Sequence, residues 1–265
     1  MNKPDLFPDR WSRNGLIICN LLAVVLLASW LWQPTRQLWD LLDVYLFHLL
    51  NAPLSTSPIW AYIWALGNMR PVDIGMGLIM LAIIIKGNWI FAGAQVRRGL
   101  FAFLTVLILL VLIRVGFVEF LKTMHWQRAS PSLTIDGAVR LTEIFPDWQA
   151  RWYLKDSSNQ SFPGDHASVL LIWAMLLSVY ARGRQLLMVW FLTTFFMLPR
   201  LASGAHWASD DFVGGLFVSL LTFGWGFYSP YAAKTSDLLE RLSAPVMQSL
   251  SKIPGLDRIS LISGR

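Results

Sequence analysis

The sequence predicts an all-α, polytopic membrane protein whose six transmembrane helices form one bundle. Composition is the first reason. Of the 265 residues, 55% are hydrophobic and only 14% are charged, and the mean hydropathy is +0.50. An ordinary soluble domain is roughly 45–50% apolar, so the composition favours a membrane protein over a soluble one.

The lengths of the apolar runs are the second reason. A run of about 20 residues with few charges is long enough to cross a bilayer as a helix. Six runs approach that length: residues 15–32, 72–85, 99–121, 166–181, 185–203 and 210–228. The run 72–85 is the shortest. The runs lie too close together for a separate soluble domain, so residues 1–230 are predicted to form one membrane domain.

The basic residues predict the orientation of that domain. Lys3, Arg10 and Arg13 precede the first run, which is longer than the apolar part of a typical signal peptide and ends in a poor cleavage context. We therefore expect a retained signal anchor with its N-terminus in the cytoplasm. More than half of the 22 Lys and Arg residues then lie on the cytoplasmic side, in agreement with the positive-inside rule. This explains the net charge of +6, and no nucleic-acid partner is expected.

The segments outside the predicted spans have patterns of their own. Residues 38–50 are apolar but contain Asp40, Asp43 and His48, which predicts an interfacial helix. The long outer segment 122–165 is rich in aromatic residues of the kind that anchor at a bilayer interface. Residues 231–265 repeat apolar side chains at helical spacing between basic ones, which predicts a cytoplasmic amphipathic tail.

Three polar clusters fall at the outer ends of the predicted spans. The first contains Lys122 and Arg128, the second contains Gly164, Asp165 and His166, and the third contains Arg200, His206 and Asp210 at the spacing R-x5-H-x3-D. Odd-numbered spans run outward and even-numbered spans run inward in the predicted topology. All three clusters then lie on one face of the membrane, which favours a single active site.

The third cluster suits nucleophilic catalysis by a histidine. Residues four apart at the start of a helix lie on one face. A carboxylate at one nitrogen of His206 would fix the tautomer and leave the other nitrogen free to attack. The alternative is that His206 and Asp210 form a pair that only caps or links helices. The presence of Arg200 and His166 favours the catalytic interpretation.

The second cluster opens the predicted fourth span. A helix N-terminus offers unpaired N–H groups and the positive end of the helix dipole, so it can bind phosphate, and Gly164 permits close approach of the backbone. His166 could protonate a leaving oxygen as a general acid. Asp165 has two interpretations, a phosphate-loop residue or a plain N-cap.

The cations around these clusters suit binding of a phosphoryl group. Lys122, Arg128 and Arg200 together could clamp its equatorial oxygens, although each alone could be an interfacial cation. Arg114 lies inside the third span, where a charge is costly, and it either pairs with Glu119 or contacts the substrate. The chain has only four His and one Cys, with no paired ligand spacing, so no metal or other cofactor is expected.

These clusters resemble the motifs of the type 2 phosphatidic acid phosphatase superfamily, K-x6-R-P, P-S-G-H and S-R-x5-H-x3-D. The third cluster matches from Arg200 to Asp210, with Pro199 in place of the Ser. The residues around the motifs, RASP at 128–131, FPGDH at 162–166 and GAHW at 204–207, are similar to those of the lipid A 1-diphosphate synthases of Gram-negative bacteria. The resemblance covers about residues 15–230.

The resemblance implies a helical bundle of the superfamily's type in the bacterial inner membrane, with the site on the periplasmic side. It implies that His206 is the nucleophile, that Asp210 orients it, and that His166 is the general acid. Phosphate would be bound by the cations of the clusters, without a metal. The chain departs from the superfamily motifs at two positions. Lys122 is one residue closer to Arg128 than the motif requires, and Asp165 adds an acidic residue directly before His166.

The resemblance further implies a reaction and its lipid partners. An enzyme of this branch takes a phosphoryl group from undecaprenyl diphosphate and places it on the 1-phosphate of lipid A, so undecaprenyl phosphate is the second product. Two other functions stay open: a phosphatase of undecaprenyl diphosphate or another lipid phosphate, and a non-enzymatic lipid-diphosphate transporter. A transporter favours polar residues at mid-membrane, whereas the ionisable residues here crowd the outer edge, Arg114 excepted.

Overall fold

The computed structural model describes residues 6–256 and 259–264, and every regular element within them is helical. The longer helices are α1 (Arg13–Leu31), α2 (Gln33–Asn51), α4 (Pro58–Gly67), α5 (Arg70–Ile85), α6 (Val96–Thr123), α10 (Asp165–Ser178), α11 (Arg184–Ala202), α12 (Leu216–Phe227) and α13 (Tyr231–Leu250). The short ones are α3 (Pro53–Thr56), η1 (Gly93–Gln95), α7 (Pro131–Thr134), α8 (Leu141–Ile144), α9 (Pro146–Trp152), η2 (Asp210–Gly215) and α14 (Ser260–Ser263). The predicted all-α class is confirmed.

Each of the six predicted spans coincides with a helix. Helix α1, helix α11 and the continuous η1–α6 helix are each long and apolar enough to cross a membrane. Helices α4 and α5 pass that test as a pair bent by 63°, and η2–α12 passes together with α13, at a bend of 67°. Helix α10 is apolar but shorter. The predicted second span is the second half of a bent pair, which explains why it is the shortest of the six apolar runs.

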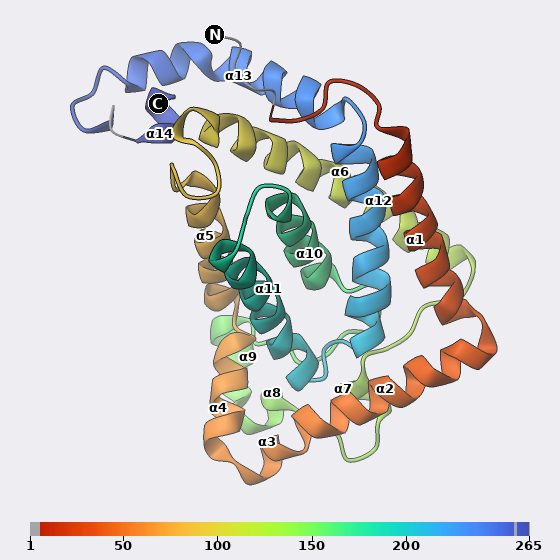
Figure 1. Cartoon of the computed structure of the whole chain (residues 1–265). Helices are drawn as coiled ribbons and strands as arrows, with labels where there is room; N and C mark the ends of the chain where they lie inside the picture. Colours follow the sequence, from red (N-terminus) through yellow and green to blue (C-terminus); the bar gives the residue numbers. More distant parts are fainter. Residues whose placement is uncertain (1–5, 257–258, 265) are drawn as a thin grey trace.

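Helix α10 lies at the centre of the bundle, with α5, α6, α11 and α12 around it (Figure 1). Most of its side chains are buried, and Ile172, Trp173 and Leu177 are almost completely inaccessible. The Trp173 ring Nε1–H donates to the carbonyl of Met80 on α5 at 3.3 Å. A helix that is hydrophobic all round belongs in the core, so α10 gives the residues at its N-terminus a rigid support.

One end of the bundle is closed by α2, α3 and the short helices α7–α9, while α13 and α14 lie at the opposite end (Figure 1). The predicted amphipathic tail is helical in α13. It packs against α6, because the Tyr231 hydroxyl donates to the carbonyl of Thr105 at 2.9 Å and Arg98 pairs with Asp237 at 3.0 Å. The clusters singled out in the sequence lie at the end closed by α2.

Helix α2 is the predicted interfacial helix, and a buried carboxylate fixes it to the bundle. Leu38 and Leu41 on α2 are exposed, but Asp43 is only 2% exposed. Its carboxylate accepts hydrogen bonds from the Ser209 backbone N–H at 2.7 Å, from the Ser209 hydroxyl at 2.6 Å and from the Arg128 guanidinium at 3.0 Å. Asp43 therefore connects α2 to the segment that carries the third cluster.

We predict that Asp43→Asn lowers the free energy of unfolding by about 3 kcal/mol, because breaking one side of a buried ion pair costs roughly 3–5 kcal/mol. Asp40→Asn is the matched control on the same helix. Asp40 pairs with Arg36 at the surface, and such a pair contributes about 0.5 kcal/mol or less. Denaturant unfolding in detergent micelles measures both variants. Equal losses would show that α2 is not fixed through Asp43.

Candidate active site

His206 lies in the turn between α11 and η2 rather than on a helix, and it is 3% exposed. Its backbone N–H and that of Ala205 donate to the carbonyl of Arg200, at 3.2 and 3.0 Å. The turn passes through Gly204 at φ +73°, where a Cβ would lie 2.7 Å from the ring of Phe47. Both the positive φ and the close packing require glycine there. Backbone geometry thus fixes the position of His206.

The two ring nitrogens of His206 face different groups. Nδ1 lies 2.9 Å from the carbonyl of Ser161, which can only accept a hydrogen bond, so Nδ1 carries a proton. The predicted partner Asp210 lies farther from Nδ1, at 3.7 Å, and it acts on the ring as a charge. Nε2 lies 3.3 Å from the carboxylate of Asp165. Nε2 is therefore the nitrogen that faces the N-terminus of α10.

The carboxylates around His206 favour its protonated form. Burial by itself lowers the pKa of His206, but the carboxylates of Asp165 and Asp210, with the nearby charge of Asp211, outweigh burial and raise the pKa to about 10. The ring is therefore an imidazolium at neutral pH while Asp165 stands beside Nε2. A histidine must be neutral to act as a nucleophile, so the Asp165 carboxylate opposes attack until another group takes its place.

Asp210 is completely buried and has its own partners. One carboxylate oxygen accepts from Nε and Nη2 of Arg128 at 3.0 and 2.7 Å, and the other accepts from the Trp207 backbone N–H at 2.7 Å. Arg128 also donates to Asp43 and to the hydroxyl of Ser209. The guanidinium of Arg128 thus lies between two buried carboxylates. It supports Asp210, and its hydrogen bonds are made to Asp210, Asp43 and Ser209.

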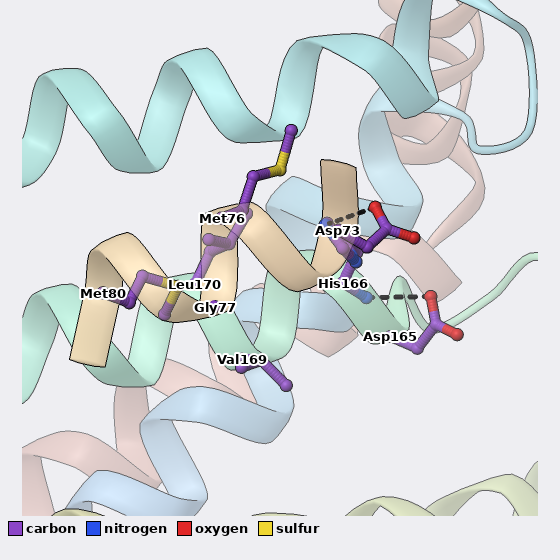
Figure 2. A pocket seen from close by; sticks show the side chains of 8 residues that line it. All are labelled: Asp73, Met76, Gly77, Met80, Asp165, His166, Val169 and Leu170. Carbon is purple, nitrogen blue, oxygen red and sulfur yellow. Dashed lines mark hydrogen bonds and ion pairs between the residues drawn. The ribbon is translucent and has the colours of Figure 1, made fainter. Parts of the chain in front are cut away.

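The N-terminus of α10 holds the second cluster. The carboxylate of Asp165 accepts from the His166 backbone N–H at 2.8 Å, and its other oxygen lies 3.8 Å from Nζ of Lys155. The ring Nε2 of His166 lies 3.6 Å from Asp73 on α5 (Figure 2). At Gly164 a Cβ would lie 2.2 Å from Asp211, so glycine is required here for the packing of α10 against η2.

Arg200 joins the site through contacts that the sequence did not indicate. Its guanidinium donates to Asp73 at 2.6 Å and to the side-chain oxygen of Asn68 at 2.7 Å. The backbone carbonyl of Asn68 also accepts from the N–H of Lys155 at 3.2 Å. Asp73 therefore contacts both Arg200 and His166, and Asn68, at the bend between α4 and α5, holds Arg200 and Lys155 together.

The structure does not bring Lys122 into this cluster. Its ammonium lies 2.6 Å from Glu119 at the exposed end of α6, so the pair that was considered for Arg114 and Glu119 is formed by Lys122 instead. Arg114 lines a separate cavity with Gln160 and Phe162, and within the described part of the chain its Nε atom has no hydrogen-bond partner. Lys155, whose Nζ is beside Asp165, is the lysine at the site.

Sequence reasoning missed Asp43, Asn68 and Asp73 as site residues, although a signal for two of them was available. Asp43 interrupts an apolar segment, and Asp73 opens the run 72–85. Acidic residues at such positions are costly in a membrane and are usually paired or functional. Asn68 carries no such signal, because its role depends on the bend between α4 and α5.

The fold and this geometry define a membrane enzyme that acts on phosphate esters. The chain belongs to the PAP2 superfamily, whose model matches residues 99–234, from α6 to the start of α13. It is similar to the lipid A 1-diphosphate synthase of Escherichia coli (strain K12), at 28% identity over 215 residues that cover 81% of this chain and 87% of that protein. No solved structure matches the chain.

We predict that Asp165→Asn moves the acid limb of the pH profile of kcat/KM to lower pH by about 1 unit, a typical effect of one adjacent charge. The Asp165 carboxylate raises the pKa of His206, so its removal lowers that pKa and leaves more neutral ring at a given pH. Asp136→Asn, an exposed carboxylate, controls for net charge. The measurement is phosphate release from a lipid phosphate between pH 5 and 10; an unmoved limb in Asp165→Asn would refute the assignment.

Proposed function

We propose that this enzyme transfers the terminal phosphoryl group of undecaprenyl diphosphate to the 1-phosphate of lipid A, giving lipid A 1-diphosphate and undecaprenyl phosphate. One observation supports phosphoryl transfer through a histidine: Nε2 of His206 faces the N-terminus of α10, where His166 also lies. The name of the similar Escherichia coli protein supports the choice of acceptor. The donor follows from the resemblance of the three clusters.

The proposed reaction consists of two displacements at phosphorus. Nε2 of His206, having lost its proton to solvent, attacks the terminal phosphorus, an N–P bond forms, and the bond from phosphorus to the bridging oxygen breaks. His166 gives its proton to that oxygen as undecaprenyl phosphate leaves. An oxygen of the lipid A phosphate then attacks the phosphoryl group of His206, the N–P bond breaks, and His166 takes the proton of the acceptor phosphate.

Binding of the donor prepares His206 for this step. The phosphoryl oxygens take the place of the Asp165 carboxylate beside Nε2. Because cations and a helix N-terminus offset their charge, these oxygens favour the imidazolium less than the Asp165 carboxylate does. Three groups then surround the phosphoryl oxygens: Lys155, Arg200 and the free N–H groups at the start of α10. A helix N-terminus and fixed cations together stabilise the charge of a transferring phosphoryl group.

The cation roles differ from those expected from the sequence. We assign the phosphate-binding role of Lys122 to Lys155, because Lys155 lies beside the Asp165 carboxylate, whose other oxygen faces Nε2 of His206. Arg128 is assigned as a positioning residue that holds Asp210, since its guanidinium contacts Asp210, Asp43 and Ser209.

A phosphatase of the same superfamily is the second candidate function, because water can replace the lipid phosphate in the second displacement. Lys155 favours transfer. Its ammonium, 3.8 Å from Asp165, attracts an anionic lipid acceptor but gives a neutral water molecule no comparable attraction. A transporter is disfavoured by membership of an enzyme superfamily.

We place the site on the periplasmic face of the bacterial inner membrane, with both termini in the cytoplasm. The basic residues of the sequence support this orientation. The arrangement of the fold agrees with it, since α13 and the start of α1 lie at the end of the bundle opposite to α2 and α7–α9 (Figure 1).

The test uses purified protein in nanodiscs with undecaprenyl diphosphate labelled in its terminal phosphate. With lipid A present, the label is expected in lipid A 1-diphosphate, and without lipid A only slow release of inorganic phosphate is expected. His206→Ala should lose at least 1,000-fold in rate while it still folds, because it removes the nucleophile. Label found only in inorganic phosphate, with and without lipid A, would establish the phosphatase instead.

A further inference from the structure

A groove between α5 and α10 leads away from the candidate site. Its volume is about 270 Å³, and its lining residues are Asp73, Met76, Gly77, Met80, Asp165, His166, Val169 and Leu170. Figure 2 shows the polar side chains at one end of this set and Met80 at the other. Asp165 lines the groove and its carboxylate also lies 3.3 Å from Nε2 of His206, so the groove begins at a residue that contacts the nucleophile.

The groove has a polar mouth and an apolar floor. From Asp73 to Met80 the helix axis rises by about 10 Å, and over that distance α5 and α10 contribute only apolar lining residues. Methionine adapts its shape to an irregular apolar ligand. Gly77 and Val169 are exposed on the outside of the bundle, so the groove opens sideways toward the surrounding lipid. A phosphate head with an apolar chain fits this combination.

Gly77 keeps the groove open. A Cβ at Gly77 would meet no heavy atom within 4 Å, so no neighbouring protein group requires glycine there. Gly99 is different, because its Cβ would meet the ring of Phe91 at 2.9 Å. A glycine inside a helix costs about 1 kcal/mol relative to alanine. The space that a side chain would fill at position 77 belongs to the groove.

The position of His166 identifies which lipid lies in the groove. In the proposed reaction His166 protonates the oxygen of the leaving group, and an in-line displacement places that leaving group opposite to His206. His166 itself lines the groove. The chain attached to the leaving phosphate therefore starts at the mouth of the groove, whereas the acceptor arrives only after that lipid has left.

We propose that this groove binds the first isoprene units of the polyprenyl chain of the donor, and that Gly77 sets its width. This inference rests on the proposed function, and it extends that function by locating the binding site of the donor's polyprenyl chain. The groove lies between two helices only, so it takes one chain and not the several acyl chains of lipid A.

The test compares Gly77→Leu with Gly75→Leu. Gly75 is a matched control on the same helix. Its Cβ also meets nothing within 4 Å, but it lines a different cavity, against α4 and α11, which shares only Met76 with the groove. For each variant, kcat/KM is measured with a C55 polyprenyl diphosphate and with the water-soluble para-nitrophenyl phosphate. The ratio of the two values should fall at least tenfold in Gly77→Leu and less than twofold in Gly75→Leu. An unchanged ratio in Gly77→Leu, or equal losses in both, would overturn the proposal.

A binding measurement separates this inference from the proposed function. In the His206→Ala background, C55 polyprenyl monophosphate should raise Tm, and adding Gly77→Leu should abolish that rise. The groove proposal requires this Tm rise and its loss whether or not the wild-type enzyme transfers phosphate from a polyprenyl diphosphate. Absence of that transfer would refute only the proposed function. Stronger stabilisation by a phosphatidate with two acyl chains than by the polyprenyl phosphate would show that the groove binds a different lipid.

Discussion

The site depends on one partly buried cation, Arg128, which lies between the buried carboxylates of Asp43 and Asp210. Taking three charges out of water is costly, and the attraction between them offsets that cost only where the geometry is good and the remaining hydrogen bonds are made. Here Ser209 and the Trp207 backbone N–H satisfy the other carboxylate oxygens. The network joins α2, the segment after α6 and the start of η2, and it fixes the negative charge of Asp210 3.7 Å from His206.

A second frame holds the groups on the other side of Nε2. Asn68, which is completely buried at the bend between α4 and α5, accepts from Arg200 and from the backbone of Lys155. Asp73, one turn farther along α5, accepts from Arg200 and lies beside His166. Reacting groups must be held to within a fraction of an ångström. The two frames together fix groups that come from a turn and two helix ends, so the site is rigid.

The sequence predicted the helical class, the helices that carry the spans and the convergence of His206, Asp210, Arg200, Asp165 and His166, because apolar length and motif spacing are local properties. It could not predict which lysine lies beside Asp165. Lys122 matched a motif approximately, but the end of α6 places it next to Glu119, and Lys155 comes from a loop with no motif. The roles of Arg128 and Gly164 also depend on packing: one contacts buried carboxylates, and the other lies against η2. Such contacts join residues that are far apart in the chain, so they cannot be predicted from the spacing of residues within a motif.

The central claim is that Nε2 of His206 becomes covalently bound to phosphorus. It is tested most directly by mixing the enzyme with donor labelled in its terminal phosphate, without acceptor, and quenching in alkali within the first turnover. Phosphohistidine survives alkali and is lost in acid, and we expect the label on the peptide that contains His206 and no label in His206→Ala. Phosphate transfer at the normal rate with no labelled peptide, or with label on His166, would contradict the account.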